Sequence, residues 1–340
     1  MELSMPVVRS DRCLLHEPAA EIWVGVPGPA AETPARMRAI LDALDARFVE
    51  AGPHPDEALL AVHDEALLAY LASAWEDWRG AGLPQEQVVP YVFAHRGLGA
   101  RREPAAVWAR PGLFAYDTMT LIGPGTWEAV RAAADAALTA VDLVAGGEPA
   151  AYACTRPPGH HVTRSAFGGS CYLNNAAIAA AALRERLDGP VAVLDVDAHH
   201  GNGTQEIFGD RADIRTGSVH VDPAAGWFPH FLGFADESGE SNLNLPLAPG
   251  SGDGPWLEAV AGLAGWARGA AGLVVALGVD AAAGDPESPL EVSGAAFREA
   301  GRLLGTLALP TVVVQEGGYD LHALGELVRE ALLGLEEGRP

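Results

Sequence analysis

The second half of the chain alternates short apolar runs with helical segments, and this alternation limits the possible fold more than any other feature. The apolar runs, which we expect to form strands, occupy residues 150–154, 191–196, 216–221, 273–277 and 311–314. Helical patterns follow at residues 174–187, 201–208, 254–268, 295–307 and 321–335. Apolar strands that alternate with helices are typical of a parallel sheet covered on both faces. The sequence therefore predicts an α/β fold.

The first half has helical patterns at residues 33–48, after Pro55, and at residues 126–145. Between them, Pro and Gly interrupt residues 82–123, which show little periodicity. Such a long irregular stretch inside a compact chain usually serves a function or is mobile. Because no repeat or linker divides the sequence, we expect one domain over residues 1–340, with its core at about 33–335.

Composition excludes several classes of protein. The chain has 22 basic residues, all Arg, against 45 acidic residues, for a net charge of −23. The absence of Lys excludes Schiff-base and P-loop lysine chemistry, and the acidic balance argues against binding to nucleic acid. Three cysteines are too few for a disulfide framework, and no apolar run is long enough to predict a membrane span or a signal peptide. We expect a cytoplasmic enzyme without a membrane partner.

Unusual polar residues follow four of the expected strands. These segments are Arg156-Pro-Pro-Gly-His160-His161, Asp195-Val-Asp197-Ala-His199-His200-Gly-Asn202, Gly278-Val-Asp280 with Asp285-Pro-Glu287, and Glu316-Gly-Gly-Tyr319. Each type of residue is ordinary by itself, since an Asp at a strand end usually caps a helix. In open α/β sheets, however, ligands bind beyond the carboxyl ends of the strands. Four such ends together indicate a functional site.

Side chains alternate along an extended chain, so Asp195, Asp197 and His199 should lie on one side. Two carboxylates and an imidazole at one edge of a sheet are costly unless a cation neutralises them. Asp197, His199 and Asp280 would supply one nitrogen and two oxygen ligands. This set suits Zn²⁺ with an open coordination position, and Fe²⁺ is chemically possible.

The segments RPPGHH, DVDAHHGNGTQ, GVDAAAGDP and EGGYDL resemble the signatures of the zinc-dependent deacetylase superfamily, which includes histone deacetylases and acetylpolyamine amidohydrolases. GPGTWEA, AWEDWRGAG and FPHFLGFADESGE are similar to the bacterial acetylpolyamine amidohydrolase branch. The resemblance covers residues 33–335. It implies a single-domain arginase/deacetylase fold, with an eight-stranded parallel sheet, helices on both faces, and the 82–123 loop near the active-site entrance. In this branch that loop often builds a homodimer, so we expect one.

The resemblance also implies roles for individual residues. Asp197, His199 and Asp280 would bind zinc; His160 and His161 would act as general base and general acid; Tyr319 would donate to the oxyanion; Asp195 and Asn202 would hold His160 and His161. A structural K⁺ would bind Asp195, Ser218 and Val219, with the backbone of Asp197 and His199. A weaker second match for K⁺ runs through Phe208, Arg211 and Ile214.

Two departures concern the substrate. Phe228 matches one aromatic wall of the family's acyl tunnel, but after Gly169 the other wall has Ser170 in place of an aromatic residue, so it should be open or polar. In the polyamine branch, acidic residues of the long loop meet the substrate cation. At those positions this chain has Trp108 and Met119, with Asp117 and Glu103 nearby. We expect Glu287 at the rim of the substrate pocket. There it resembles a residue that selects cationic substrates in the polyamine-selective eukaryotic branch of the family.

The sequence thus predicts a zinc-dependent enzyme that removes acetyl groups from small cationic amines such as acetylpolyamines. The alternatives are deacetylation of acetyl-lysine in peptides, deacetylation of another small amide, and an inactive protein that binds acyl amides. The arginase relatives share the fold but need further Asp ligands for two manganese ions. The chain has His200-Gly-Asn202 after His199 and so lacks those Asp ligands. We therefore exclude an arginase-type enzyme with two manganese ions.

Overall fold

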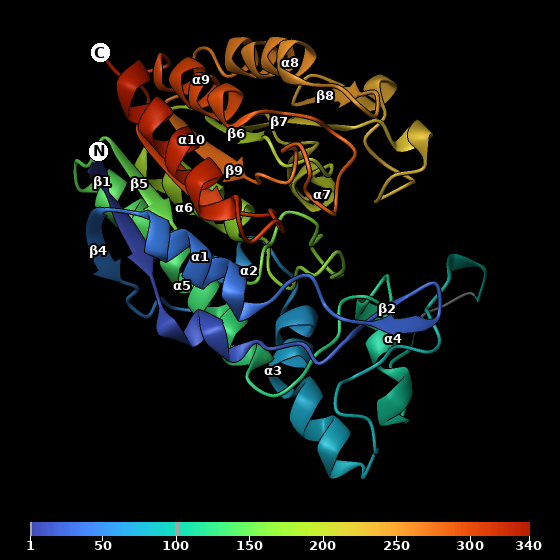
Figure 1. The fold of residues 1–340 in the computed structure, drawn as a ribbon. Helices are drawn as coiled ribbons and strands as arrows, with labels where there is room; N and C mark the ends of the chain where they lie inside the picture. Colours follow the sequence, from blue (N-terminus) through green and yellow to red (C-terminus); the bar gives the residue numbers. More distant parts are fainter. Residues whose placement is uncertain (1, 99–101) are drawn as a thin grey trace.

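A sheet of parallel strands forms the centre of the computed structural model, which describes residues 2–98 and 102–340 (Figure 1). Within these residues the sheet has eight strands in the order β4-β1-β5-β10-β9-β6-β7-β8. Their bounds are β1 Leu3–Arg9, β4 Ala46–Glu50, β5 Ala150–Ala153, β6 Val191–Asp195, β7 Ile214–Val221, β8 Asn242–Leu247, β9 Gly272–Leu277 and β10 Thr311–Gln315. The predicted eight-stranded α/β fold is confirmed.

Helices cover both faces of the sheet. One face packs against α1 (Pro34–Ala43), α8 (Asp253–Trp266), α9 (Gly294–Gly305) and α10 (Leu324–Gly338). The other packs against α2 (Glu57–Leu60), α3 (Glu65–Gly80), α5 (Thr126–Ala145), α6 (Asn175–Arg186) and α7 (Asn202–Phe208). The remaining helices are α4 (Pro111–Phe114) and short 3-10 turns at Asp11–Leu15, Arg96–Leu98, Val107–Ala109, Pro223–Ala225 and Ala235–Glu237.

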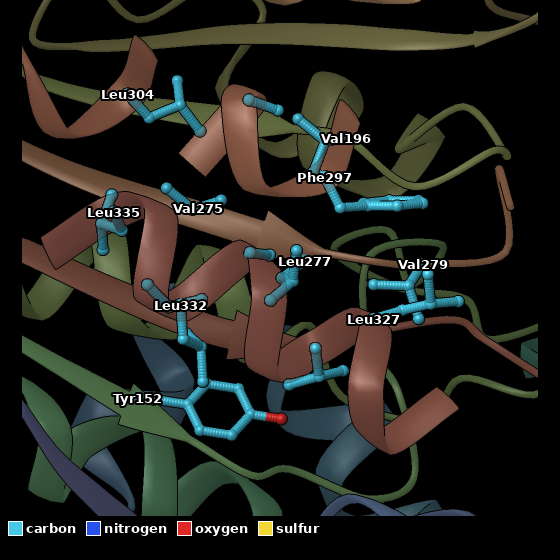
Figure 2. Close-up of a cluster of buried hydrophobic side chains, with 14 of the residues drawn as sticks. Tyr152, Val196, Val275, Leu277, Val279, Phe297, Leu304, Leu327, Leu332 and Leu335 are labelled. Atoms are coloured by element: carbon cyan, nitrogen blue, oxygen red, sulfur yellow. The ribbon is translucent and has the colours of Figure 1, made fainter. Parts of the chain in front are cut away.

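Alternation along the buried strands builds the two cores. In β9, Val275 and Leu277 point to the α9–α10 side, and Val274 and Ala276 point to the α5–α6 side. Figure 2 shows the first of these layers, in which Phe297 from α9 and leucines from α9 and α10 meet β9. Since both faces are buried, these strands are apolar throughout, which is why the sequence showed them clearly.

Three strands of the sheet, β1, β4 and β8, had no counterpart among the strands expected from the apolar runs. The predicted helix at residues 33–48 was wrong at its end, because α1 stops at Ala43 and Phe48 lies in β4. β4 is an edge strand with mostly exposed side chains, so it lacks the apolar pattern of a buried strand. β1 lies before residue 33, where the expected core begins, and it pairs with β4 and β5.

The segment 82–123 is largely irregular, as predicted, and a small hairpin lies against it (Figure 1). The hairpin consists of β2 (Glu21–Trp23) and β3 (Val26–Gly28). Two hydrogen bonds join Ile22 to Thr118, from the Ile22 amide to the Thr118 carbonyl at 3.3 Å and from the Thr118 hydroxyl to the Ile22 carbonyl at 2.7 Å. Across residues 2–98 and 102–340, no helix is long and apolar enough to cross a bilayer.

Candidate functional site

The tandem histidines follow β5 and lie beside the end of β6. His160 Nδ1 lies 2.9 Å from a carboxylate oxygen of Asp195, and His161 Nδ1 lies 2.7 Å from the side-chain oxygen of Asn202. The two imidazole rings are 4.0 Å apart between centroids. Each histidine therefore contacts the residue that the resemblance assigned to it, one charged and one neutral.

The two histidines differ in their preferred charge state. Burial lowers the pKa of His160, but the carboxylates of Asp197 and Asp195 outweigh burial and raise it to about 10. Burial and the neighbouring His160 hold the pKa of His161 well below its usual value. His161 is therefore the neutral imidazole, the form that can accept a proton.

The three predicted metal ligands converge on one point. His199 Nδ1 lies 3.1 Å from Asp197 Oδ1 and 3.2 Å from Asp280 Oδ2, and one ligand atom from each residue lies within 4.8 Å of the others. Burial and the charge of Asp197 raise the pKa of Asp280 to about 7. Two buried carboxylates this close favour a bound cation, and one nitrogen with two oxygens fits Zn²⁺ or Fe²⁺.

Glycines make room for these carboxylates. A Cβ at Gly278 would lie 2.0 Å from Asp197 Oδ2, and one at Gly317 would lie 2.1 Å from Asp280 Oδ2. Only a hydrogen fits at either position, so both glycines are required for the ligands to converge.

The loop that carries Tyr319 is held from two sides. Arg36 donates hydrogen bonds of 2.6 Å to the carbonyls of Glu316 and Gly318, and its guanidinium lies 4.5 Å from the centre of the Tyr319 ring. On the other side, the amide of Tyr319 donates to Asp285 at 2.7 Å. These contacts fix the backbone from which Tyr319 reaches the cavity.

Sequence reasoning assigned no role to Arg36 or to Glu316. The Glu316 carboxylate accepts hydrogen bonds from the amides of Gly159, at 2.6 Å, and His160, at 3.1 Å, and so positions the tandem histidines. Burial raises the pKa of Glu316 to about 7. Glu316 could have been found in the sequence, because it lies in a strand-end motif. Arg36 gave no such signal, because it lies in a helix some 280 residues from Glu316.

Each of the four strand-end segments contributes at least one residue to the cavity above these groups, and the N-terminal region contributes two residues that the sequence did not predict. Its lining residues are Glu21, Ala31, Met119, Pro158, His160, His161, Gly169, Ser170, His199, Phe228, Glu287 and Tyr319. The predicted substrate-contacting residues Gly169, Ser170, Phe228 and Glu287 all lie there. Glu21 and Ala31 come from the N-terminal region, to which the sequence analysis assigned no part of the site.

Asp117, also expected to contact substrate, is engaged with the protein. Its carboxylate accepts hydrogen bonds from the amides of Gly169 at 2.6 Å, Met119 at 3.0 Å and Thr120 at 2.9 Å. The Thr120 hydroxyl donates to it as well, at 3.2 Å. Asp117 therefore braces the Gly169–Ser170 wall, while neutral Met119 faces the cavity and Glu103 pairs with Arg110.

A second aromatic ring lies beside Phe228, although Ser170 does not supply it. The Tyr116 ring is nearly parallel to that of Phe228, with centroids 6.4 Å apart, and its hydroxyl donates to the carbonyl of His161 at 3.0 Å. Both rings line a groove that adjoins the cavity. Tyr116 thus lines the adjoining groove, whereas Ser170 lines the cavity itself.

The residues expected to bind potassium lie beneath the site. Ser218 in β7 is opposite Asp195 in β6, and its hydroxyl lies 2.8 Å from His220 Nδ1. Val219 follows it and is buried. At the weaker second match, the Phe208 carbonyl already accepts a hydrogen bond from the amide of Arg211, at 2.8 Å.

Comparisons with known proteins agree with this geometry. Residues 30–335 match the histone deacetylase domain family. The chain is 37% identical to an acetylpolyamine amidohydrolase of Mycoplana ramosa, over 97% of this chain and 99% of the relative. It is 39% identical to acetylpolyamine amidohydrolase 1 of Pseudomonas aeruginosa, over 97% and 98%.

A solved structure is similar over the same length. The crystal structure of an acetylpolyamine aminohydrolase from Burkholderia pseudomallei superposes with a TM-score of 0.92 at 36% identity, and covers 99% of this chain and 100% of its own. These matches show that the chain belongs to the histone deacetylase family.

Proposed function

We propose that this protein is a zinc-dependent amidohydrolase that removes acetyl groups from acetylpolyamines. One observation carries the proposal: Asp197, His199 and Asp280 lie in the same site as two differently charged histidines and Tyr319, at the base of a cavity with carboxylates on its wall. Near-full-length similarity to acetylpolyamine amidohydrolases supports the choice of substrate.

Zinc would be held by Asp197, His199 and Asp280. A Zn²⁺ ion there would polarise the acetyl carbonyl and make water a better nucleophile at neutral pH. A backbone amide orients each carboxylate: Asp280 accepts from Ala198 at 2.8 Å and Asp197 from Gly317 at 2.8 Å. The donor set also accommodates Fe²⁺, so metal content must be measured on protein purified without added metal.

His161 is the proton acceptor in this proposal. When its Nδ1–H donates to Asn202, its Nε2 is free to take a proton from the attacking water and return it to the leaving amine. His160, whose pKa is raised by the carboxylates of Asp197 and Asp195, orients the water and stabilises negative charge. The Tyr319 hydroxyl donates a hydrogen bond to the oxygen that becomes negative in the transition state.

We also propose the structural potassium ion, bound by Asp195, Ser218 and Val219 with the backbone carbonyls of Asp197 and His199. The facing positions of Asp195 and Ser218 on neighbouring strands support it. Oxygen ligands of this kind suit a hard cation.

A homodimer is the proposed assembly. Large apolar side chains are exposed around the cavity entrance, notably Trp23 and Val24 at the hairpin tip and Phe231 beyond Phe228. They border the apolar groove next to the cavity. A contiguous exposed apolar surface marks an interaction site, and a second copy of the chain brings a matching apolar surface by symmetry.

The function is tested by kcat/KM values of the zinc-loaded enzyme. The kcat/KM values for N-acetylputrescine and N-acetylspermidine should be higher than those for acetyl-lysine peptides and small neutral amides. Faster turnover of the peptides would instead favour a peptide deacetylase. Zinc-loaded protein that binds acetylated amines without hydrolysing any of them would point to an inactive acyl-amide-binding protein.

A further inference from the structure

A second cavity lies beside α3, away from the catalytic cavity. Its volume is about 450 Å³, and its walls come from α3, from residues 102–114 of the long loop and from Ser165. None of the described residues that line it also lines the catalytic cavity. A ligand in this second cavity would therefore leave the catalytic cavity open to substrate.

One side of the second cavity is apolar. Ala66, Ala69 and Tyr70 share a face of α3, since residues three and four positions apart lie on the same side of a helix. Leu113 and Phe114 of α4 also line the cavity, and the Phe114 ring stacks on that of Tyr70 with centroids 4.5 Å apart. This side suits the apolar body of a ligand.

Two buried hydrogen-bond donors belong to residues of the same cavity. Among the described residues, neither the Tyr70 hydroxyl nor Arg110 Nε has a hydrogen-bond partner. Tyr70 is only 5% exposed, and burial raises its pKa, so the hydroxyl keeps its proton. Unpartnered buried donors are costly, so two of them on one cavity favour a ligand that brings acceptor atoms.

Arg110 uses only part of its guanidinium. Its Nη1 donates to Asp77 at 3.0 Å, and its Nη2 pairs with Glu103. Nε and Nη2 form one edge of a guanidinium, and a carboxylate can bind such an edge through two parallel hydrogen bonds. In the described part of the chain only Nη2 of this edge is paired, so the edge is half used.

Glu103 is the group that a ligand would displace. The Tyr70 hydroxyl and Arg110 Nε are shielded from water, so a ligand reaches them only when a neighbouring group moves. The Glu103 side chain shares the Nε–Nη2 edge and is 61% exposed. An exposed ion pair adds little stability, so its replacement costs little.

The charge around the cavity also favours an anion. The chain has a net charge of −23, yet two of the three charged residues that line this cavity are Arg102 and Arg110. Arg102 is exposed and adds a second positive charge to that of Arg110. In a strongly acidic protein, such a local reversal of sign attracts anions that the rest of the surface repels.

We propose that this second cavity binds a small organic carboxylate, which replaces Glu103 on the Nε–Nη2 edge of Arg110 and accepts a hydrogen bond from Tyr70. The apolar body of the ligand lies against Leu113 and Phe114. Glu103 is then an internal competitor that occupies the edge until a ligand carboxylate arrives. The site goes beyond the proposed function and does not rest on it.

Isothermal titration calorimetry with benzoate tests the site. The zinc-loaded protein is first saturated with acetohydroxamate, which chelates the metal, so that benzoate cannot bind there. The wild type should bind benzoate saturably, and it should bind benzyl alcohol at least about tenfold more weakly because the alcohol has no charge for Arg110.

Three variants locate the binding. Tyr70→Phe removes only the hydroxyl, so benzoate affinity should fall by about 5–50-fold, while thermal stability without benzoate should stay the same or rise. Glu103→Gln removes the competing charge, so affinity should rise by about 1.5–5-fold. Arg79→Gln is the control, since Arg79 is an exposed residue of α3 that does not line the cavity, and its affinity should equal that of the wild type.

Equal benzoate affinity in the wild type and in Tyr70→Phe would overturn the site, as would benzyl alcohol that binds as tightly as benzoate. Weaker binding in Glu103→Gln would show that Glu103 helps to hold the ligand, and would overturn its replacement. Hydrolysis of N-acetylputrescine is measured separately, so a failure of the proposed function would leave the outcome for this site unchanged.

Discussion

Asn202 gives His161 a neutral hydrogen-bond partner, while burial and His160 keep the pKa of His161 low. Asn202→Asp would place a carboxylate against His161 Nδ1 and should raise the pKa of His161. In the proposed mechanism neutral His161 accepts the proton, so activity should be lost as pH falls through the pKa of His161. The acid limb of kcat/KM should therefore move to higher pH in the variant. A pH–rate profile with an unmoved acid limb would contradict the assignment of His161 as the base.

Asp280 should affect stability in opposite directions with and without metal. Its folded-state pKa of about 7 exceeds the ordinary value of 3.8, so its protonated form stabilises the metal-free protein at low pH, and this contribution is lost as pH rises toward 7. Metal-free Asp280→Asn should therefore gain stability over the metal-free wild type between about pH 4 and 7.

With zinc present the order should reverse, because the wild type alone keeps the full ligand set. Thermal unfolding across this pH range, paired with zinc content and activity, checks the prediction. Full activity in a zinc-free Asp280→Asn protein would end the metal hypothesis.

Tyr319→Phe removes a hydroxyl and leaves the ring over Arg36. Loss of one oxyanion donor typically lowers kcat by about 10²–10³. Zinc content and KM should change little, because neither depends on the hydroxyl. An unchanged kcat in steady-state assays would mean that the oxyanion is stabilised without Tyr319.

At the scale of elements, α9 and α10 approach so closely that glycine is needed between them. A Cβ at Gly334 would lie 1.9 Å from the carbonyl oxygen of Arg298. Gly334→Ala should lower the free energy of unfolding by about 1–3 kcal/mol, because the helices must separate. The matched control is Gly265→Ala in α8, where nothing lies within 4 Å. It should be neutral or stabilise by up to about 1 kcal/mol. Denaturant unfolding compares the two, and equal effects would refute the packing argument.

At the scale of the whole molecule, the exposed apolar rim predicts association. Phe231 is 86% exposed beside the groove. Phe231→Glu should convert a dimer into a monomer. The interface would then bury one unpaired carboxylate from each copy of the chain, and burying an unpaired charge is costly. Light scattering during size-exclusion chromatography gives the mass. A monomeric wild type at high micromolar concentration would refute the dimer.

The chemistry of this protein was readable from its sequence for a physical reason. Parallel strands end at one edge of a sheet, so polar residues after β5, β6, β9 and β10 had to meet. The buried strands were equally clear because both of their faces are apolar. Asp197, His199 and Asp280 could thus be grouped from the sequence alone.

Only the tertiary structure decided what surrounds that group. Arg36 reaches the Tyr319 loop across some 280 residues, and Glu21 reaches the cavity from a hairpin of three-residue strands. Asp117 looked like a free acid near the entrance, but its carboxylate is used by backbone amides. Contacts of this kind depend on where irregular segments pack, and no periodicity in the sequence encodes that packing.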